Sequence, residues 1–350
     1  MAIGVADGVS PGSEPVPLIV PDPFRIAIVS DIHYAGPAET ARGHSMLGRI
    51  ENPLRRWLVG QHRHWVWMRE NWTHNHFLDR FIREAQGAGL VVANGDYSCD
   101  SAYVGVSDEA SFESAGECLG RMRSAFGDRF YGTIGDHELG KMMLGAAAGG
   151  LRLASYRKAT GALSLEPFWQ RRIGRYVLIG VTSTLIALPL FEAEAVKAEW
   201  PEWCRLRDEH RVEIRGAFQA LGRSDRVLLF CHDPSALPFL AKDDFLGDRI
   251  GCIERTIIGH LHSKWILRQA RLMAGMPPIG FLGHTPRRLS RALREARHWK
   301  RFNLFFCPSP AGIQLFKDGG YCTAELDPEG TTPARFRFHP MAWPRSGPLN

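Results

Sequence analysis

The sequence has no C-x-x-C pair, and its seven cysteines are odd in number and widely spaced. These absences argue against a disulfide framework and against a zinc site built from thiolates. The first residues, MAIGVADGVSPGSEP, lack the basic region and the apolar run of a secretory signal. No apolar stretch reaches the roughly 20 residues that a membrane-spanning helix needs. We therefore expect a cytoplasmic protein in a reducing compartment.

The chain has 350 residues, of which 45% are hydrophobic, and this is enough for a sizeable buried core. Lysine and arginine number 43 against 37 for aspartate and glutamate, so the net charge is +6 and favours an anionic partner of some kind. Prolines are frequent near both ends of the chain. We predict an irregular N-terminal arm over 1–23, a single domain over 24–326 and a Pro-rich C-terminal tail over 327–350.

Short β-rich runs recur along this domain, and most of them are followed by a turn or by a helical pattern of apolar residues. The alternation predicts an α/β architecture. The predicted strands are Phe24–Ser30, Leu90–Ala93, Phe130–Ile134, Tyr176–Thr182, Val227–Phe230, Arg255–Ile258, Leu304–Phe306 and Ile313–Phe316.

The segment between the first two predicted strands is too long for a simple connection and is rich in tryptophan. We predict a cap insertion over 35–75, which can form a hydrophobic lid. A crossover helix is predicted from apolar residues that recur three, four or six positions apart, namely Trp65, Met68, Trp72, Leu78, Ile82 and Ala85. Four histidines also lie here, at 62, 64, 74 and 76, and an ordinary helix face explains them better than an extra metal site does.

Aspartate and histidine residues follow five of the predicted strands. In an open α/β sheet the carboxyl ends of neighbouring strands meet at the edge where ligands bind. Carboxylate oxygen together with imidazole nitrogen suits Mn, Fe, Co or Zn, whereas oxygen alone would suit Mg or Ca. Five strand ends supply too many donors for one ion. The residues are Asp31 and His33, Asp96, Asp136 with His137 and Glu138, His232, and His260 with His262.

These motifs stand in the order D-x-H, G-D, G-D-H-E, H and G-H-x-H. In this order the sequence resembles the calcineurin-like metallophosphoesterases over about residues 24–265. The resemblance implies a four-layer α/β/β/α sandwich with two divalent or trivalent metal ions, of Mn, Fe, Zn or Co, between the edges of two sheets. It implies that Asp31, His33 and His262 hold the first ion, that His232 and His260 hold the second, and that Asp96 bridges both.

The same resemblance implies that Asp136 occupies the place of a metal-binding asparagine, that His137 is catalytic and that Glu138 orients His137. Two cations roughly 3.5–4 Å apart can ionise a bridging water, which then attacks phosphorus in line. We therefore expect hydrolysis of a phosphodiester, pyrophosphate or phosphomonoester bond of a small molecule or lipid. The extra negative charge of Asp136 favours a diester. A nucleotide phosphohydrolase and a non-catalytic binding scaffold on the same fold are the alternatives.

Seven basic residues and one acid lie between Arg287 and Arg301, interleaved with an apolar stripe that includes Leu289, Leu293, Ala296 and Trp299. This pattern predicts an amphipathic helix over 287–302. The helix either packs its stripe on the domain or attaches the protein to an anionic inner membrane surface, with Trp299 shallowly inserted. Nucleic acid is disfavoured because no recognition motif is present. The sequence leaves the oligomeric state open.

Overall fold

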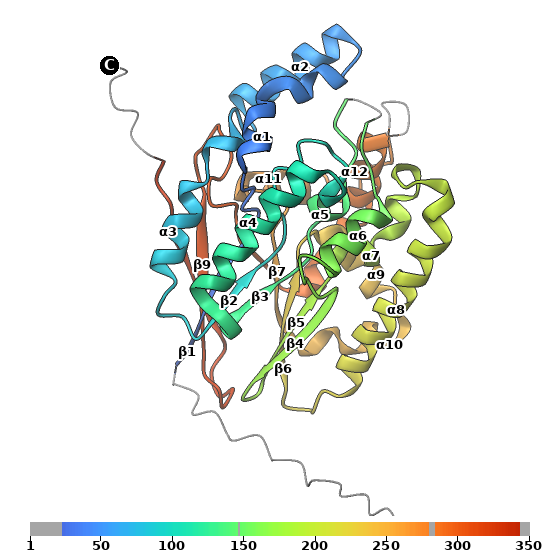
Figure 1. Ribbon diagram of the computed structural model, residues 1–350. Helices are drawn as coiled ribbons and strands as arrows, with labels where there is room; N and C mark the ends of the chain where they lie inside the picture. The colour runs from blue at the N-terminus through green and yellow to red at the C-terminus, as the bar shows by residue number, and fades with distance from the viewer. Residues whose placement is uncertain (1–22, 146–147, 280–283, 344–350) are drawn as a thin grey trace, which may run out of the picture.

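The structure is a computed structural model that describes residues 23–145, 148–279 and 284–343 (Figure 1). All but the last residue of the predicted N-terminal arm lies outside these ranges. The strands of the described part form two five-stranded sheets. In the first sheet the order is β10 (Arg335–Pro340), β9 (Gly320–Leu326), β1 (Phe24–Val29), β2 (Leu90–Ala93) and β3 (Phe130–Gly132). In the second it is β4 (Phe168–Ile173), β5 (Tyr176–Val181), β6 (Arg226–Cys231), β7 (Ile253–Ile258) and β8 (Leu304–Phe306).

Most neighbouring strands are parallel. In the first sheet β1, β2 and β3 run parallel, while β9 is antiparallel to both β1 and β10. In the second sheet β5 to β8 run parallel, and β4 is antiparallel to β5. Parallel strands need crossover connections, and helices supply most of them. The carboxyl ends of the parallel strands therefore share one edge in each sheet.

The helices are α1 (Pro37–Arg42), α2 (Pro53–Trp65), α3 (His76–Glu84), α4 (Glu109–Phe126), α5 (Asp136–Leu139), α6 (Leu153–Thr160), α7 (Ser183–Ile186), α8 (Trp200–Gln219), α9 (Leu237–Ala241), α10 (Asp244–Arg249), α11 (Lys264–Leu272) and α12 (His284–Glu295). Short 3₁₀ helices lie between them: η1 (Gly43–Arg49), η2 (Asn71–Thr73), η3 (Gly105–Ser107), η4 (Gly127–Arg129), η5 (Leu188–Leu190), η6 (Glu192–Glu194), η7 (Lys197–Glu199), η8 (Pro234–Ala236), η9 (Ile250–Cys252) and η10 (Ala296–Phe302).

The two sheets pack face to face, with helices on the outer side of each. Successive side chains of a strand point to opposite faces. Accordingly Ile26 and Ile28 of β1 belong to one buried cluster with Leu178 of β5 and Phe230 of β6, between the sheets. Ala27 and Val29 belong instead to the larger cluster that includes the helices. This arrangement confirms the predicted α/β/β/α sandwich.

Three strands were not predicted, and one predicted strand is wrong. Residues 313–316 form a turn rather than a strand. The missed strands are β4, β9 and β10. Of these, β4 and β10 each lie at one edge of a sheet, and both contain arginines beside their apolar residues. Exposed charges on an edge strand prevent pairing with other chains, and they also conceal the strand in a hydrophobicity pattern. The predicted irregular tail over 327–350 therefore contributes β10.

The predicted single helix through 65–85 is wrong, because the chain leaves the helical path after Trp65. The carbonyl groups of Val66 and Trp67 accept backbone N–H groups from Leu315 and Gln314, at 3.2 and 2.6 Å. This long-range pairing replaces the helix between α2 and α3. Helix α2 has no buried residue and lies at the top of Figure 1, away from both sheets.

The basic segment over 287–302 is α12 followed by η10, and most of its apolar stripe packs on the domain. Leu293, Ala296 and Trp299 are each 4% exposed, whereas Leu289 is 56% exposed. The sequence left open that Trp299 inserts into a lipid surface. Because its side chain is buried in the domain, Trp299 is unable to do so. Within the described ranges, no helix combines the length and the apolar character that crossing a membrane requires.

Candidate metal centre

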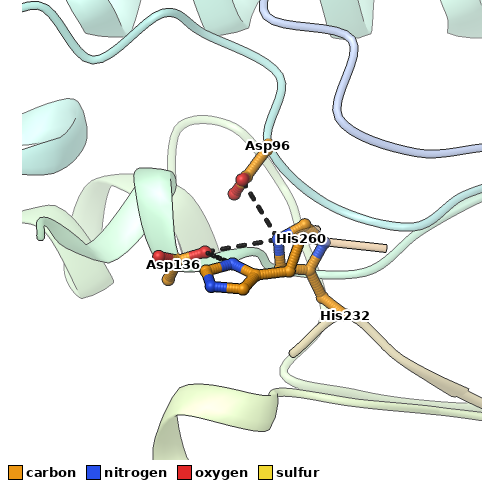
Figure 2. A group of neighbouring side chains, drawn as sticks. All are labelled: Asp96, Asp136, His232 and His260. Carbon is orange, nitrogen blue, oxygen red and sulfur yellow. Dashed lines mark hydrogen bonds and ion pairs between the residues drawn. The ribbon is translucent and has the colours of Figure 1, made fainter. Parts of the chain in front are cut away.

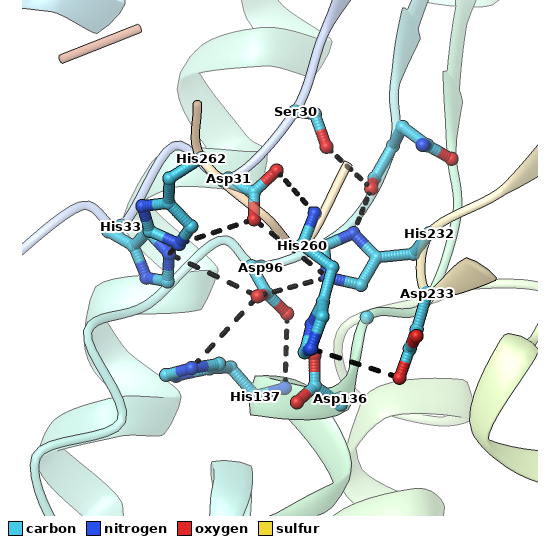
Figure 3. Close-up of polar contacts among 12 residues, drawn as sticks. Ser30, Asp31, His33, Asp96, Asp136, His137, His232, Asp233, His260 and His262 are labelled. Atoms are coloured by element: carbon cyan, nitrogen blue, oxygen red, sulfur yellow. Dashed lines mark hydrogen bonds and ion pairs between the residues drawn. The ribbon is translucent and has the colours of Figure 1, made fainter. Parts of the chain in front are cut away.

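The structure brings together all of the residues that the sequence singled out. Asp31 and His33 follow β1, Asp96 follows β2, and Asp136 and His137 begin α5 just after β3 (Figure 3). From the second sheet, His232 follows β6, and His260 and His262 follow β7. The site thus lies where the strand ends of the two sheets meet.

Five of these residues have a positive φ angle, a backbone conformation that residues other than glycine rarely adopt. The φ angles are +54° at Asp31, +50° at His33, +62° at Asp96, +63° at His260 and +57° at His262. Each left-handed residue of this kind costs on the order of 1 kcal/mol and persists only where its surroundings fix it. Such a concentration at one place is typical of a functional site.

Two glycines permit the close approach of the loops that carry the donors. A Cβ atom at Gly135 would clash with Asp96, and one at Gly259 would clash with Ser30 and Asp31. Of the glycines that precede a donor, Gly95 has the positive φ, +89°, that a tight turn needs.

The first group of donors contains Asp31, His33 and His262. The Nε2 atoms of the two histidines lie 3.1 Å apart, and Nε2 of His262 lies 3.4 Å from Oδ1 of Asp31. Two ligand atoms that each sit about 2.1 Å from one ion are about 3.0–3.4 Å apart at tetrahedral to octahedral angles. Nδ1 of His33 lies 3.2 Å from the carbonyl oxygen of Ser98, which can only accept a hydrogen bond. The tautomer in which Nδ1 donates this bond has its lone pair on Nε2, where it can bind a metal.

The second group contains Asp96, Asp136, His232 and His260 (Figure 2). Nε2 of His232 lies 3.0 Å from Oδ2 of Asp96 and 3.2 Å from Oδ1 of Asp136, and Nδ1 of His260 lies 2.9 Å from the same Asp136 oxygen. Nδ1 of His232 donates to the carbonyl of Asn94 at 2.5 Å. The ring of His232 is therefore oriented with Nε2 toward the carboxylates.

Asp96 lies between the two groups. Its Oδ2 atom is 3.0 Å from Nε2 of His232 and 4.0 Å from Nε2 of His33, and its Oδ1 atom accepts the backbone N–H of His137 at 3.0 Å. Both groups thus have access to the same carboxylate. This position fits a carboxylate that bridges two ions.

The electrostatics of the site favour cations. Burial opposes the charged form of His232, yet Asp96 and Asp31 outweigh it and raise its pKa well above the usual value. The carboxylates thus create a strongly negative potential. The first group has an open acceptor, because Oδ2 of Asp31 accepts the backbone N–H of His260 at 3.0 Å while its buried Oδ1 makes no hydrogen bond in the described structure. The donor set therefore fits two metal ions of intermediate hardness.

The predicted role of Glu138 is wrong. Its carboxylate accepts the backbone N–H groups of Gly135, Asp96 and Tyr97, at 2.9, 3.0 and 2.8 Å, and not a proton from the His137 ring. Burial, with the nearby charge of Asp96, raises the pKa of Glu138 to about 8. Glu138 is therefore a positioning residue that fixes the turn carrying Asp96.

His137 faces both donor groups, and its ring makes no hydrogen bond with the residues that the structure describes. Its Nε2 atom is 4.0 Å from Oδ2 of Asp96, and its ring meets that of His33 edge to face at 4.8 Å between centroids. Burial lowers the pKa of His137 to about 3 even though Asp96 opposes the shift, so the ring is neutral. A neutral imidazole at this place can donate a hydrogen bond to a bound phosphoryl oxygen.

Lys141 belongs to the site and was missed by sequence reasoning. Its Nζ atom lies 2.8 Å from Oδ2 of Asp136. Burial disfavours its charge, but Asp136 outweighs that effect and raises the pKa of Lys141. The lysine follows α5 in a loop with no motif of its own, so the sequence offers only its nearness to Asp136 as a signal. The pair offsets the extra negative charge that Asp136 brings.

Lys141→Met is expected to lower the free energy of unfolding of the metal-free protein by about 2 kcal/mol, because it leaves a buried carboxylate without its cation. Denaturant unfolding measures the change. The double variant Lys141→Met, Asp136→Asn should recover most of the loss. As a matched control, Lys158→Met removes a more exposed ion pair with Glu109 and should cost less than about 1 kcal/mol. Equal losses in Lys141→Met and Lys158→Met would contradict the pairing.

A cavity of about 340 Å³ opens beside the two donor groups. His33, His137 and His260 line its inner end, and Lys141 and Arg288 add positive charge. The rest of the wall is largely apolar and comes from the segment after α2, from the loop after α5 and from α12; it includes Trp67, Met68, Met143, Leu289 and Leu293. The ring of Trp67 also packs at a tilt against that of His262, with 4.6 Å between ring centroids. The size and the apolar wall suit a small organic ligand.

No family model and no curated protein matches the sequence. Among solved structures, a dimetal phosphatase from Danio rerio aligns with 87% of this chain and 93% of its own at 13% identity and a TM-score of 0.48. A purple acid phosphatase from yellow lupin aligns with 68% and 38% at 12% identity and a TM-score of 0.31, and a phosphopantetheinyl hydrolase from Mycobacterium tuberculosis with 69% and 83% at 12% and 0.31. These values are too low to transfer an activity to this chain.

Proposed function

We propose that the chain is a metal-dependent phosphoesterase with two metal ions, and that it hydrolyses a phosphodiester, pyrophosphate or phosphomonoester bond of a substrate with an apolar portion. The observation that carries this proposal is the pair of donor groups with Asp96 between them, beside an apolar cavity whose inner end is lined by His33, His137 and His260. Loss of several donors would have favoured a non-catalytic scaffold. Every donor that the resemblance implies is present, with aspartate in place of asparagine at 136.

Two bound cations would supply charge neutralisation at a phosphoryl group and a water of lowered pKa. The residues of the chain have distinct parts in this proposal. Asp31, His33 and His262 hold one ion, and His232 with His260 and Asp136 holds the other. Asp96 connects the groups. His137 donates a hydrogen bond to a phosphoryl oxygen, which lies where charge accumulates during the displacement.

From the sequence, the extra negative charge of Asp136 favoured a diester over a monoester; in the structure, nearby positive charge offsets it. Lys141 lies 2.8 Å from that carboxylate and Arg288 lines the same cavity, so a phosphate dianion meets positive as well as negative charge. What supports a substrate with an apolar portion is the cavity wall. Burial of an apolar group of the substrate against the methionine, leucine and tryptophan side chains of this wall would lower the free energy of binding.

The test uses alkyl p-nitrophenyl phosphodiesters of increasing chain length with saturating Mn²⁺. We expect hydrolysis that stops on chelation, with kcat/KM rising by up to about fourfold per methylene until the cavity is filled. Ala292→Phe provides a control, because Ala292 lines the cavity and is not one of the metal donors. The variant should hydrolyse the methyl diester as the wild type does and should lose the gain from longer chains.

Each component of the proposal has its own contrary outcome. Absence of hydrolysis of every diester and of p-nitrophenyl phosphate would contradict the phosphoesterase assignment. Equal rates for all chain lengths, with faster hydrolysis of nucleotide pyrophosphates, would replace the apolar substrate with a nucleotide. Preference for p-nitrophenyl phosphate over every diester would identify a monoesterase.

A further inference from the structure

Helix α2 exposes large apolar side chains to solvent. Leu54, Trp57, Leu58 and Trp65 are 65%, 60%, 52% and 63% exposed. The helix projects from the molecule at the top of Figure 1, and none of its residues is buried. Exposed tryptophans are costly to keep in water, and a group of them on one element marks a contact surface.

These side chains share one face of the helix. At 100° per residue, Leu54, Trp57, Leu58, Gln61 and Trp65 fall within an arc of about 100°. Trp65 donates its indole N–H to the Gln61 side chain at 3.0 Å, so this face satisfies its polar atoms locally. Val59 and Arg63 fall on the opposite side of the helix, and both line the cavity. One side of α2 thus belongs to the site, and the other side faces away from the protein.

Helix α2 is positively charged and has no acidic residue. At 100° per residue Arg55 borders the apolar face, whereas Arg56 and Arg63 lie on the opposite side of the helix. Across the cavity, α12 presents Arg291 and Arg294 to solvent. Leu144 and Leu289 line the cavity and are 46% and 56% exposed, so its rim also has apolar side chains. Apolar side chains flanked by arginines are complementary to an anionic lipid surface.

We propose that α2 docks on an anionic lipid bilayer, with Leu54, Trp57, Leu58 and Trp65 inserted among the lipids. Docking does not depend on catalysis. The further step, in which the bilayer supplies an apolar phosphoester as substrate, rests on the proposed function. The contact is placed on α2 and not on the 287–302 stripe, because Trp299 is buried and Trp57 and Trp65 are not.

A second copy of the chain fits this face less well than lipid does. A two-fold interface through α2 would place identical surfaces against each other. Such an interface would bring two positively charged helices together, with no acidic residue on either helix to offset the repulsion. An anionic bilayer offers both an apolar interior and a complementary charge.

The experiment measures co-sedimentation of the full chain with two kinds of vesicle, phosphatidylcholine alone and phosphatidylcholine with phosphatidylglycerol in equal parts. We expect binding to the second kind at low salt, release at high salt, and little binding to the first. The double variant Trp57→Ala, Trp65→Ala should weaken binding by on the order of tenfold or more. Arg55→Glu should also weaken it, and an acidic residue in the first turn preserves the helix.

Val212→Ala on α8, which removes an exposed apolar side chain from a different helix, is the matched control and should bind as the wild type does. The tryptophan variant should hydrolyse the soluble methyl diester normally, since neither tryptophan lines the cavity. Failure of docking is thus distinguishable from failure of the proposed function. Unchanged binding of the tryptophan variant, equal binding to both vesicles, or a solution dimer that the tryptophan variant dissociates would each overturn the proposal.

Discussion

Asp96→Ala is expected to remove both metal ions and to abolish hydrolysis. Asp96 is the carboxylate that both donor groups share, at 3.0 Å from His232 and 4.0 Å from His33. Its loss leaves the two buried groups with fewer negative charges to offset the repulsion between two cations. Elemental analysis of the purified variant after equilibration with Mn²⁺ measures the loss, alongside circular dichroism to verify the fold.

Two single-group variants serve as controls for Asp96. His33→Ala removes a donor of the first group, and His260→Ala removes a donor of the second. Each is expected to weaken mainly one of the two ions, so about one ion per chain should remain. The bridging assignment is refuted if Asp96→Ala retains one tightly bound ion in the same way.

His137→Ala is expected to retain both ions and to lose on the order of 10² to 10⁴ in turnover, the usual size of a contribution from a proton donor or charge-stabilising group. The structure supports this role because the neutral ring lines the cavity beside Asp96 without a hydrogen bond of its own. Steady-state rates on the best diester, together with metal content, measure it. KM should change much less than kcat if the hydrogen bond forms mainly in the transition state.

A ligand role for His137 is the alternative, since His137, His33 and Asp96 also form a group with metal-binding spacing. Loss of one ion from His137→Ala would establish that role. Glu138→Gln is the companion variant. It keeps the shape of a side chain that accepts three backbone N–H groups, and it should reduce turnover less than His137→Ala does. Equal activity of His137→Ala and the wild type would remove His137 from the chemistry altogether.

The donors were predictable because each follows a strand with a clear pattern. Val29 and Ala93 end short, mostly buried runs, and parallel strands bring their carboxyl ends to one edge. Asp31 and Asp96 follow those ends. The donors could therefore be predicted from the positions of the strands in the sequence, without knowledge of any distance between remote residues.

The missed features depend on the path of the chain after α5 and on one long-range contact. Lys141 joins the site because the chain after α5 brings its Nζ atom to 2.8 Å from Oδ2 of Asp136. Glu138 contacts the backbone of Asp96, 42 residues away, rather than the ring beside it. The alternating Arg-Phe-Arg-Phe at 335–338 did carry a strand signal, which the nearby prolines outweighed. The apolar stripe at 287–302 gave no way to decide between packing and lipid, and the buried Trp299 decides it in favour of packing.

The most direct test of the account is the number of metal ions that the wild-type chain binds. Elemental analysis at saturating Mn²⁺, after removal of free ions, measures it without any knowledge of the substrate. The two donor groups, with Asp96 between them, predict two ions per chain. One ion or none at saturation would contradict the two-metal centre, and with it the proposed phosphoesterase function.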